Sequence, residues 1–138
     1  MPSYWVAALC LVLTAGAAAA GPAPGQPWEL VGESGWVKMV YVEPARIKDT
    51  RLLAQIVADL MGRFGSTNPM QVDFFDDRAL TPTALPSPPR QRIHQRAKFN
   101  FNPRNGLRRF VWMEWVPVDP NQPAKVKPRE TEEELPPP

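Results

Sequence analysis

The sequence predicts an α+β fold: a small two-layer domain with a sheet of about four strands and one main helix packed on one face. Three observations support this prediction. β-Branched and aromatic residues fill 36–44, apolar residues recur at helical spacing from Leu52 to Phe64, and alternation from Ala97 to Phe101 precedes an Asn-Gly turn. With a further strand at 70–75, the order is β-α-β-β-β, ending in a C-terminal β-hairpin.

The first predicted strand, residues 36–44, is apolar on both faces and is closed by a proline. We therefore expect it inside the sheet rather than at an edge. The helix follows, and either Asp49 or Thr50 can cap its N-terminus. Gly65 is placed to end it, because glycine enters the left-handed region of backbone space without steric cost.

Residues 70–75 (MQVDFF) form the next predicted strand. If this strand runs parallel to the first, the helix between them is a right-handed crossover. Residues 78–95 are predicted to be irregular because prolines interrupt them, with a short helix over about 88–96 that Ser87 would cap. A loop of this length is uncommon in a compact domain and is often functional.

Residues 97–115 predict the hairpin. Apolar and polar side chains alternate along the first strand, and the turn NPRNG supplies a proline and an Asn-Gly pair that tolerates positive φ. On the return strand, Phe110 and Trp112 share one face, while Val111 and Met113 share the other. The pattern leaves open which of these faces belongs to the core.

The first twenty residues predict a cleavable signal peptide, so we expect the chain to be exported to a periplasmic or extracellular location. The apolar run from Trp5 to Leu13 is shorter than the about 20 residues that span a bilayer. This segment has no Lys or Arg, which leaves an uncleaved anchor or a misassigned start as alternatives. Cys10, the only cysteine, lies within it, so the mature chain is expected to lack disulfides and thiol chemistry.

Low-complexity composition marks both ends of the mature chain. Residues 21–27 (GPAPGQP) predict a flexible lead-in. Residues 117–138 contain seven prolines and a glutamate run, with almost nothing to bury, and predict a disordered tail. A single folded domain is therefore expected over residues 28–116.

A run of basic residues is the main candidate binding feature. Seven Lys and Arg side chains lie between Arg90 and Arg109 without an intervening acid. Clustered arginines suit phosphate or sulfate groups, because the guanidinium pairs with oxyanions through two hydrogen bonds. The residues predicted to bind an anion or a partner are Arg92, Arg96, Lys98, Arg104, Arg108 and Arg109. The alternative is that these cations only form the solvated face of the hairpin.

Three acids at the end of strand 70–75, Asp73, Asp76 and Asp77, are the second candidate. Carboxylates beyond a strand end can bind a metal ion or act as acid and base, with His94 as a neighbour. Their spacing lacks the alternation and glycine of a calcium loop. The alternative is that Asp76 and Asp77 cap a turn and pair with Arg78 or the basic hairpin.

These features favour a non-enzymatic domain without cofactor or metal, which binds a partner protein or an envelope polyanion. The net charge of +2 and the predicted export argue against nucleic acid. No phosphate loop, metalloprotease or nucleophile-elbow motif is present. Two alternatives remain: a metal-dependent or acid/base enzyme using the aspartates, and a structural protein that self-associates through a free sheet edge or exposed tryptophans.

Overall fold

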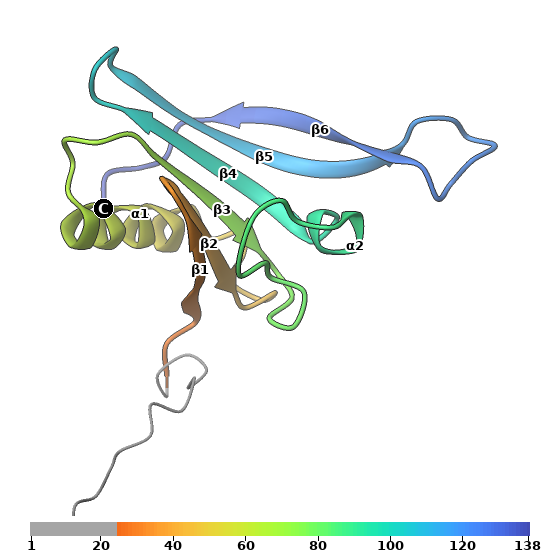
Figure 1. Ribbon diagram of the computed structural model, residues 1–138, viewed down its shortest axis with the longest axis horizontal. Helices are drawn as coiled ribbons and strands as arrows, with labels where there is room; N and C mark the ends of the chain where they lie inside the picture. Colours follow the sequence, from red (N-terminus) through yellow and green to blue (C-terminus); the bar gives the residue numbers. More distant parts are fainter. Residues whose placement is uncertain (1–24) are drawn as a thin grey trace, which may run out of the picture.

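A computed structural model describes residues 25–138 of the chain (Figure 1). The predicted signal peptide, residues 1–20, and the first part of the lead-in lie outside the described residues. The strands are β1 (Trp28–Ser34), β2 (Val37–Val42), β3 (Met70–Phe75), β4 (Gln95–Asn102), β5 (Leu107–Pro117) and β6 (Val126–Glu133). The helices are α1 (Thr50–Phe64) and the short α2 (Pro89–Arg92).

The strands form one mixed sheet in the order β1-β2-β3-β4-β5-β6. Only β2 and β3 are parallel, and α1 connects them, while the remaining neighbours are antiparallel. The α+β class and the strand–helix–strand unit are thus confirmed. The predicted sheet of four strands is wrong, because a strand is added at each edge.

The strand missed at the first edge is β1, which pairs with β2. Its sequence, WELVGES, carries two glutamates and a glycine, so neither alternation nor β-propensity marks it clearly. The register shifts between Leu30 and Gly32, which is a β-bulge. Gly35, with φ of 58°, provides the left-handed residue of the turn into β2.

The strand missed at the other edge is β6, so the prediction of a disordered tail from residue 117 is wrong. β6 pairs with β5 from Phe110↔Glu133 to Pro117↔Val126. Beyond it, Leu135 is buried in the core, and the last residues lie against α1 (Figure 1). Composition indicated disorder because it does not show which strand a segment pairs with. β5 offers a long edge, and its Arg109 forms ion pairs with Glu130 and Glu132 of β6.

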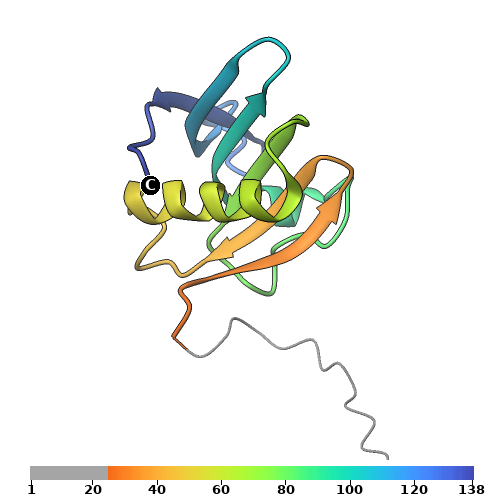
Figure 2. The same ribbon diagram turned by 90° about the vertical axis from the view of Figure 1, so that its left-hand side faces the viewer.

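Helix α1 begins and ends where the sequence predicts. The Asp49 carboxylate accepts a hydrogen bond from the Leu52 amide at 3.1 Å, and Gly65 follows the helix with φ of 86°. The apolar stripe of α1, with Leu53, Ile56 and Leu60 fully buried, packs on one face of the sheet (Figure 2). We call this side of the sheet the helix face.

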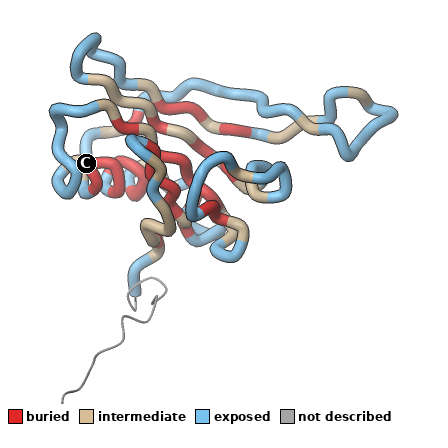
Figure 3. The backbone as a smooth tube through the Cα atoms, in the orientation of Figure 1, coloured by how far each residue is buried: buried red, intermediate tan, exposed pale blue. Residues whose placement is uncertain are grey.

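The core lies between α1 and the helix face, where the buried residues cluster (Figure 3). Val72, Phe74 and Phe99 of the central strands are almost completely buried there. Phe110 joins them from β5, and its ring meets the Trp112 ring edge-on at 4.9 Å between centroids. These contacts show which side of the return strand faces the core. Phe110 and Trp112 point to the helix face, and Val111 and Met113 point to the opposite face.

The opposite face is partly covered by residues 76–88, and we call it the loop face. Arg78 in this segment donates to the Glu29 carboxylate of β1, with one bond of 3.0 Å. Thr83 lies so close to Gly32 of β1 that a Cβ there would meet the Thr83 Cα at 2.5 Å. Helix α2 then begins at Pro89 rather than Pro88, and its N-cap is Pro88 rather than the predicted Ser87. The long loop is therefore packed on the sheet, with Thr81 buried.

Candidate binding surface

Three of the six predicted binding cations form ion pairs within the chain. Lys98 donates to Glu130 at 3.1 Å, and Arg109 donates to Glu132 at 3.1 Å. Arg96 donates to the Asp76 carboxylate at 2.7 Å. The glutamates belong to β6, so the acidic end of the chain neutralises much of the basic hairpin.

The pairs on the loop face also shield apolar surface. Val111 of β5 lies opposite Lys98 on one side and Glu132 on the other, and it is fully buried. Long charged side chains cover apolar neighbours with their methylene stems while their charges stay in water. Lys98 and Arg109 thus have a structural role that their place in a basic run does not reveal.

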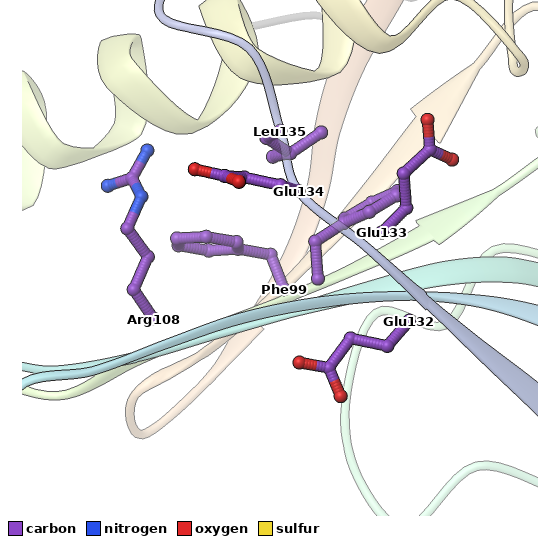
Figure 4. A pocket seen from close by; sticks show the side chains of 7 residues that line it. Phe99, Arg108, Glu132, Glu133, Glu134 and Leu135 are labelled. Atoms are coloured by element: carbon purple, nitrogen blue, oxygen red, sulfur yellow. The ribbon is translucent and has the colours of Figure 1, made fainter.

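Arg108 lies on the helix face, away from Lys98 and Arg109. Its guanidinium carbon is 5.3 Å from the centroid of the Phe99 ring, within cation–π range. It borders a hollow of about 310 Å³ between β4, β5 and the chain end, whose other walls include Glu134 and Leu135 (Figure 4). In this view the Glu134 side chain lies above the Phe99 ring, and its carboxylate points toward the Arg108 guanidinium.

The remaining two predicted cations lie at opposite ends of the hairpin. Arg104 is exposed in the turn between β4 and β5, where its amide donates to Asn102 at 3.0 Å. Arg92 belongs to α2, just before β4 begins. The six residues therefore do not form one surface, although the structure leaves their binding role a prediction.

The three aspartates of the second candidate point to different partners. Asp77 accepts from the amides of Ala79 and Leu80 at 3.0 and 3.2 Å, which closes a turn. Asp76 binds Arg96, and Asp73 accepts a hydrogen bond from the side-chain Nε2 of Gln71 at 2.9 Å. Over residues 25–138, no group of three or more His, Cys, Asp or Glu side chains is placed to hold a metal ion.

Asp73 is buried, and its pKa is shifted. Burial on the loop face raises the pKa of Asp73 from 3.8 to about 6, because the ionised carboxylate loses its water. The hydrogen bond from Gln71 and the charge of Lys98 oppose this shift. Asp73 is the direct β-sheet partner of Lys98, but the Lys98 ammonium binds Glu130 instead.

His94 lies beside Asp76, with 3.3 Å between its Nδ1 and the carboxylate. The loop folds back over the strand end, since the Asp76 amide also donates to the His94 carbonyl at 3.2 Å. Arg96 binds the other oxygen of the same carboxylate. Among the described residues, no hydroxyl group hydrogen-bonds to His94, so the arrangement holds a loop closed and contains no assembled nucleophile.

A groove lies between α2 and the projecting end of the β5–β6 hairpin. We call it the arm groove. Its volume is about 280 Å³, and its lining residues are Pro89, Arg92, Ile93, Trp115, Val126, Lys127 and Pro128. The two elements that form it lie next to each other at the far end of the sheet from the β4–β5 turn (Figure 1).

Trp115 is held firmly in the arm groove. Its indole Nε1 donates to the Gln95 carbonyl at 2.9 Å, and β6 places Pro128 directly opposite it. Ile93 contributes an apolar side chain that is 38% exposed. The groove thus has apolar walls that remain partly accessible to solvent.

Two cations, Arg92 and Lys127, line the arm groove, and Arg90 and Lys125 are close to its lining residues in sequence. We call these four residues the arm cations. None of them forms an ion pair with any residue from 25 to 138. Asp119, the acid of the β5–β6 loop, accepts from the Asn121 amide at 2.9 Å.

The binding residues predicted from the sequence include only Arg92 of this groove. Val126, Lys127 and Pro128 were missed because they lie in the segment expected to be disordered. The available signal was the length of the return strand: residues 107–117 extend past the start of β4 and need a further partner.

Comparison with known proteins gives no relative from which to read a function. No protein-family model matches the chain, and no curated protein or solved structure shows significant similarity to it. Among the described residues, no helix has the length and apolarity needed to cross a membrane.

Proposed function

We propose that this chain is a non-enzymatic domain that is exported and binds a partner protein through the arm groove. The observation that carries the proposal is a hydrogen-bonded, half-buried tryptophan in the same groove as cations that have no acidic partner in the described chain. Tryptophan and arginine are the residues most enriched at the energetic centres of protein interfaces.

The proposal keeps Arg92 from the predicted binding set and moves the centre of the surface away from the β4–β5 hairpin. A cation that already has a carboxylate partner must exchange that partner for the ligand, so its net gain on binding is small. Lys98, Arg96 and Arg109 are in this position. The arm cations have no carboxylate partner among residues 25–138, so they have none to exchange.

Trp115 supports a role in recognition because its ring is already oriented before any partner arrives. A side chain that loses no rotamer freedom on binding avoids an entropic cost of about 0.5 to 1.5 kcal/mol. The hydrogen bond to Gln95 satisfies the indole N–H, which leaves the ring available for apolar contact.

The small size of the arm groove favours a protein partner over a small substrate. Its volume is about 280 Å³. Sites for small molecules and cofactors usually occupy about 300 to 1,000 Å³. The arm groove accommodates a side chain of a partner rather than a whole cofactor.

Self-association through a sheet edge is the less favoured alternative, because both edges carry protective features. β6 is rich in charge and contains Pro128, which has no N–H to offer a further strand. β1 has its bulge and is tied to the loop by Glu29 and Arg78. A homodimer through these edges stays a prediction that the mass in solution will test.

The test is capture of partners by the affinity-tagged full chain from its own cell-envelope extract, washed at low and at high salt. Two charge-reversed variants with the same change in net charge are compared: Arg92→Glu with Lys127→Glu at the arm groove, and Arg104→Glu with Arg108→Glu at the other end. Circular dichroism confirms that each variant is folded.

We expect a discrete protein to be retained by the wild type and by the Arg104/Arg108 variant, and to be lost from the Arg92/Lys127 variant. Loss from the Arg104/Arg108 variant alone would overturn the choice of surface in favour of the hairpin. Heterogeneous polyanionic material that is released at high salt would overturn the protein partner in favour of an envelope polymer.

A further inference from the structure

We infer that the segment bound in the arm groove is acidic and carries one apolar side chain that inserts against Trp115. This inference rests on the proposed function and specifies the chemistry of the partner. The juxtaposition that carries it is an apolar groove of about 280 Å³ whose rim bears Arg92 and Lys127.

The apolar component follows from the walls of the groove. Trp115 and Pro128 face each other across β5 and β6, and Ile93 and Pro89 approach from α2. Contact with such surface is favourable for an apolar group, which leaves water on both sides of the interface. A uniformly charged polymer has no group to place there, so the walls favour a peptide over a polysaccharide or nucleic acid.

The acidic component follows from the charges at the rim. Arg92 and Lys127 belong to elements that are distant in sequence, and the fold brings both to one groove. Their only acidic neighbour in the β5–β6 loop, Asp119, caps a turn. A carboxylate beside the inserted apolar residue finds a guanidinium that can bind it through two hydrogen bonds.

Charge also separates this surface from the rest of the molecule. The loop face carries alternating ion pairs between Lys98, Arg109, Glu130 and Glu132, so an acidic segment gains little there. The hollow beside Arg108 is bordered by glutamates, which repel an acidic segment. The arm groove is the place among these three where an anionic peptide meets cations without a competing acid.

The test uses a random twelve-residue peptide library displayed on phage and selected on the tagged full chain. Selected peptides are then measured for binding to the wild type, to the Arg92→Glu, Lys127→Glu variant and to the matched Arg104→Glu, Arg108→Glu variant. The indole N–H signal of Trp115 in NMR spectra reports directly whether a peptide occupies the groove.

We expect the selected peptides to share an aliphatic or aromatic residue flanked by Asp or Glu, and to shift the Trp115 signal. The Arg92/Lys127 variant should bind them at least about tenfold more weakly, and the Arg104/Arg108 variant should bind them within about twofold of wild type. Replacing the acids of a selected peptide with Asn or Gln should weaken it by a similar factor.

Other outcomes separate this inference from the proposed function. Peptides that shift Trp115 but lack acids would overturn the acidic chemistry and leave the arm groove as the binding surface. Peptides that bind both variants equally and leave Trp115 unshifted would overturn the groove itself. Failure of the library to enrich any peptide, alongside successful capture from the extract, would overturn a linear acidic segment while the proposed function stands.

Discussion

Lys98 on β4 donates its ammonium to Glu130 on β6 at 3.1 Å, although β5 lies between the two strands. Val111 of β5 is fully buried beside this pair. The contact joins a cation of the predicted binding run to an acid of the segment predicted to be disordered. It therefore connects the basic run, for which a binding role was predicted, with the C-terminal segment, for which disorder was predicted.

The Lys98–Glu130 pair should contribute a small but measurable coupling. In a double-mutant cycle with Lys98→Ala and Glu130→Ala, we expect a coupling free energy of about 0.5 to 1 kcal/mol, because both side chains are partly shielded from water. Urea unfolding of the four proteins measures it. A control cycle between Lys98→Ala and the distant Glu33→Ala should be additive, and a Lys98–Glu130 coupling no larger than that control would contradict the expectation.

Asp73 should make the stability of the fold depend on pH. Its pKa is about 6 in the folded chain and 3.8 ordinarily, so folding favours the protonated carboxyl. This contribution is full below the ordinary value and is lost as the pH rises through about 6. We expect Asp73→Asn to raise the free energy of unfolding near pH 8 by about 1 to 3 kcal/mol and to leave it almost unchanged near pH 3.

Urea unfolding of wild type and Asp73→Asn across this pH range provides the measurement. Asn keeps a side-chain oxygen for the hydrogen bond from Gln71, so the comparison isolates the charge. The exposed Asp59→Asn serves as the control and should not reproduce the gain at high pH. Parallel pH profiles for wild type and Asp73→Asn would show that burial of the carboxyl is not coupled to folding.

Leu135 should be a core residue in energetic terms as well as in position. It is 8% exposed and belongs to the cluster beneath α1, so Leu135→Ala is expected to lower the free energy of unfolding by about 2 to 3 kcal/mol. Leu107 is 42% exposed, and Leu107→Ala is expected to change it by about 0.5 kcal/mol or less. Equal effects of the two substitutions would indicate that the end of the chain does not pack in solution.

Gly32 should report on the packing of residues 76–88 against the sheet. A Cβ at this position meets the Thr83 backbone at 2.5 to 2.7 Å, so Gly32→Ala forces the loop away and is expected to cost about 2 kcal/mol or more. Gly62, exposed in α1, has nothing within 4 Å of the same atom. Gly62→Ala is therefore expected to stabilise the chain by about 0.5 to 1 kcal/mol, and thermal unfolding compares the two.

A Gly32→Ala protein as stable as wild type would mean that Thr83 is readily displaced. The loop would then be a movable cover over the sheet instead of part of its packing. Limited proteolysis after Arg78 distinguishes these cases, because a displaced loop becomes accessible to trypsin.

Local rules sufficed for the elements whose signals lie within one segment. The cap at Asp49, the end of α1 at Gly65 and the alternation of Ala97 and Phe99 in β4 depend on neighbours in sequence, and the structure confirms each of them. The strand β3 was also predicted, whereas its parallel pairing with β2 was left conditional and is shown by the structure.

The two edge strands were not predicted, because composition does not show which strand a segment pairs with. By residue composition, Glu132 and Glu133 belong to a solvated tail, but in the structure they pair with Val111 and Phe110 of β5. The arm groove was missed for the same reason, since Arg92 and Lys127 meet only through tertiary structure. The aspartates show the converse: Asp73, Asp76 and Asp77 are close in sequence but serve three separate hydrogen-bonding arrangements.

The sheet has one more consequence, which concerns how the chain is assembled. Because strand order in the sheet equals strand order in the chain, every strand from β2 to β6 is laid beside the one synthesised just before it. Most additions close a short loop or one that α1 shortens, which favours rapid folding, whereas the addition of β4 closes the long loop of residues 76–94. The growing sheet always exposes one unpaired edge during synthesis, and the last strand to join is the one whose proline and charges discourage any further addition.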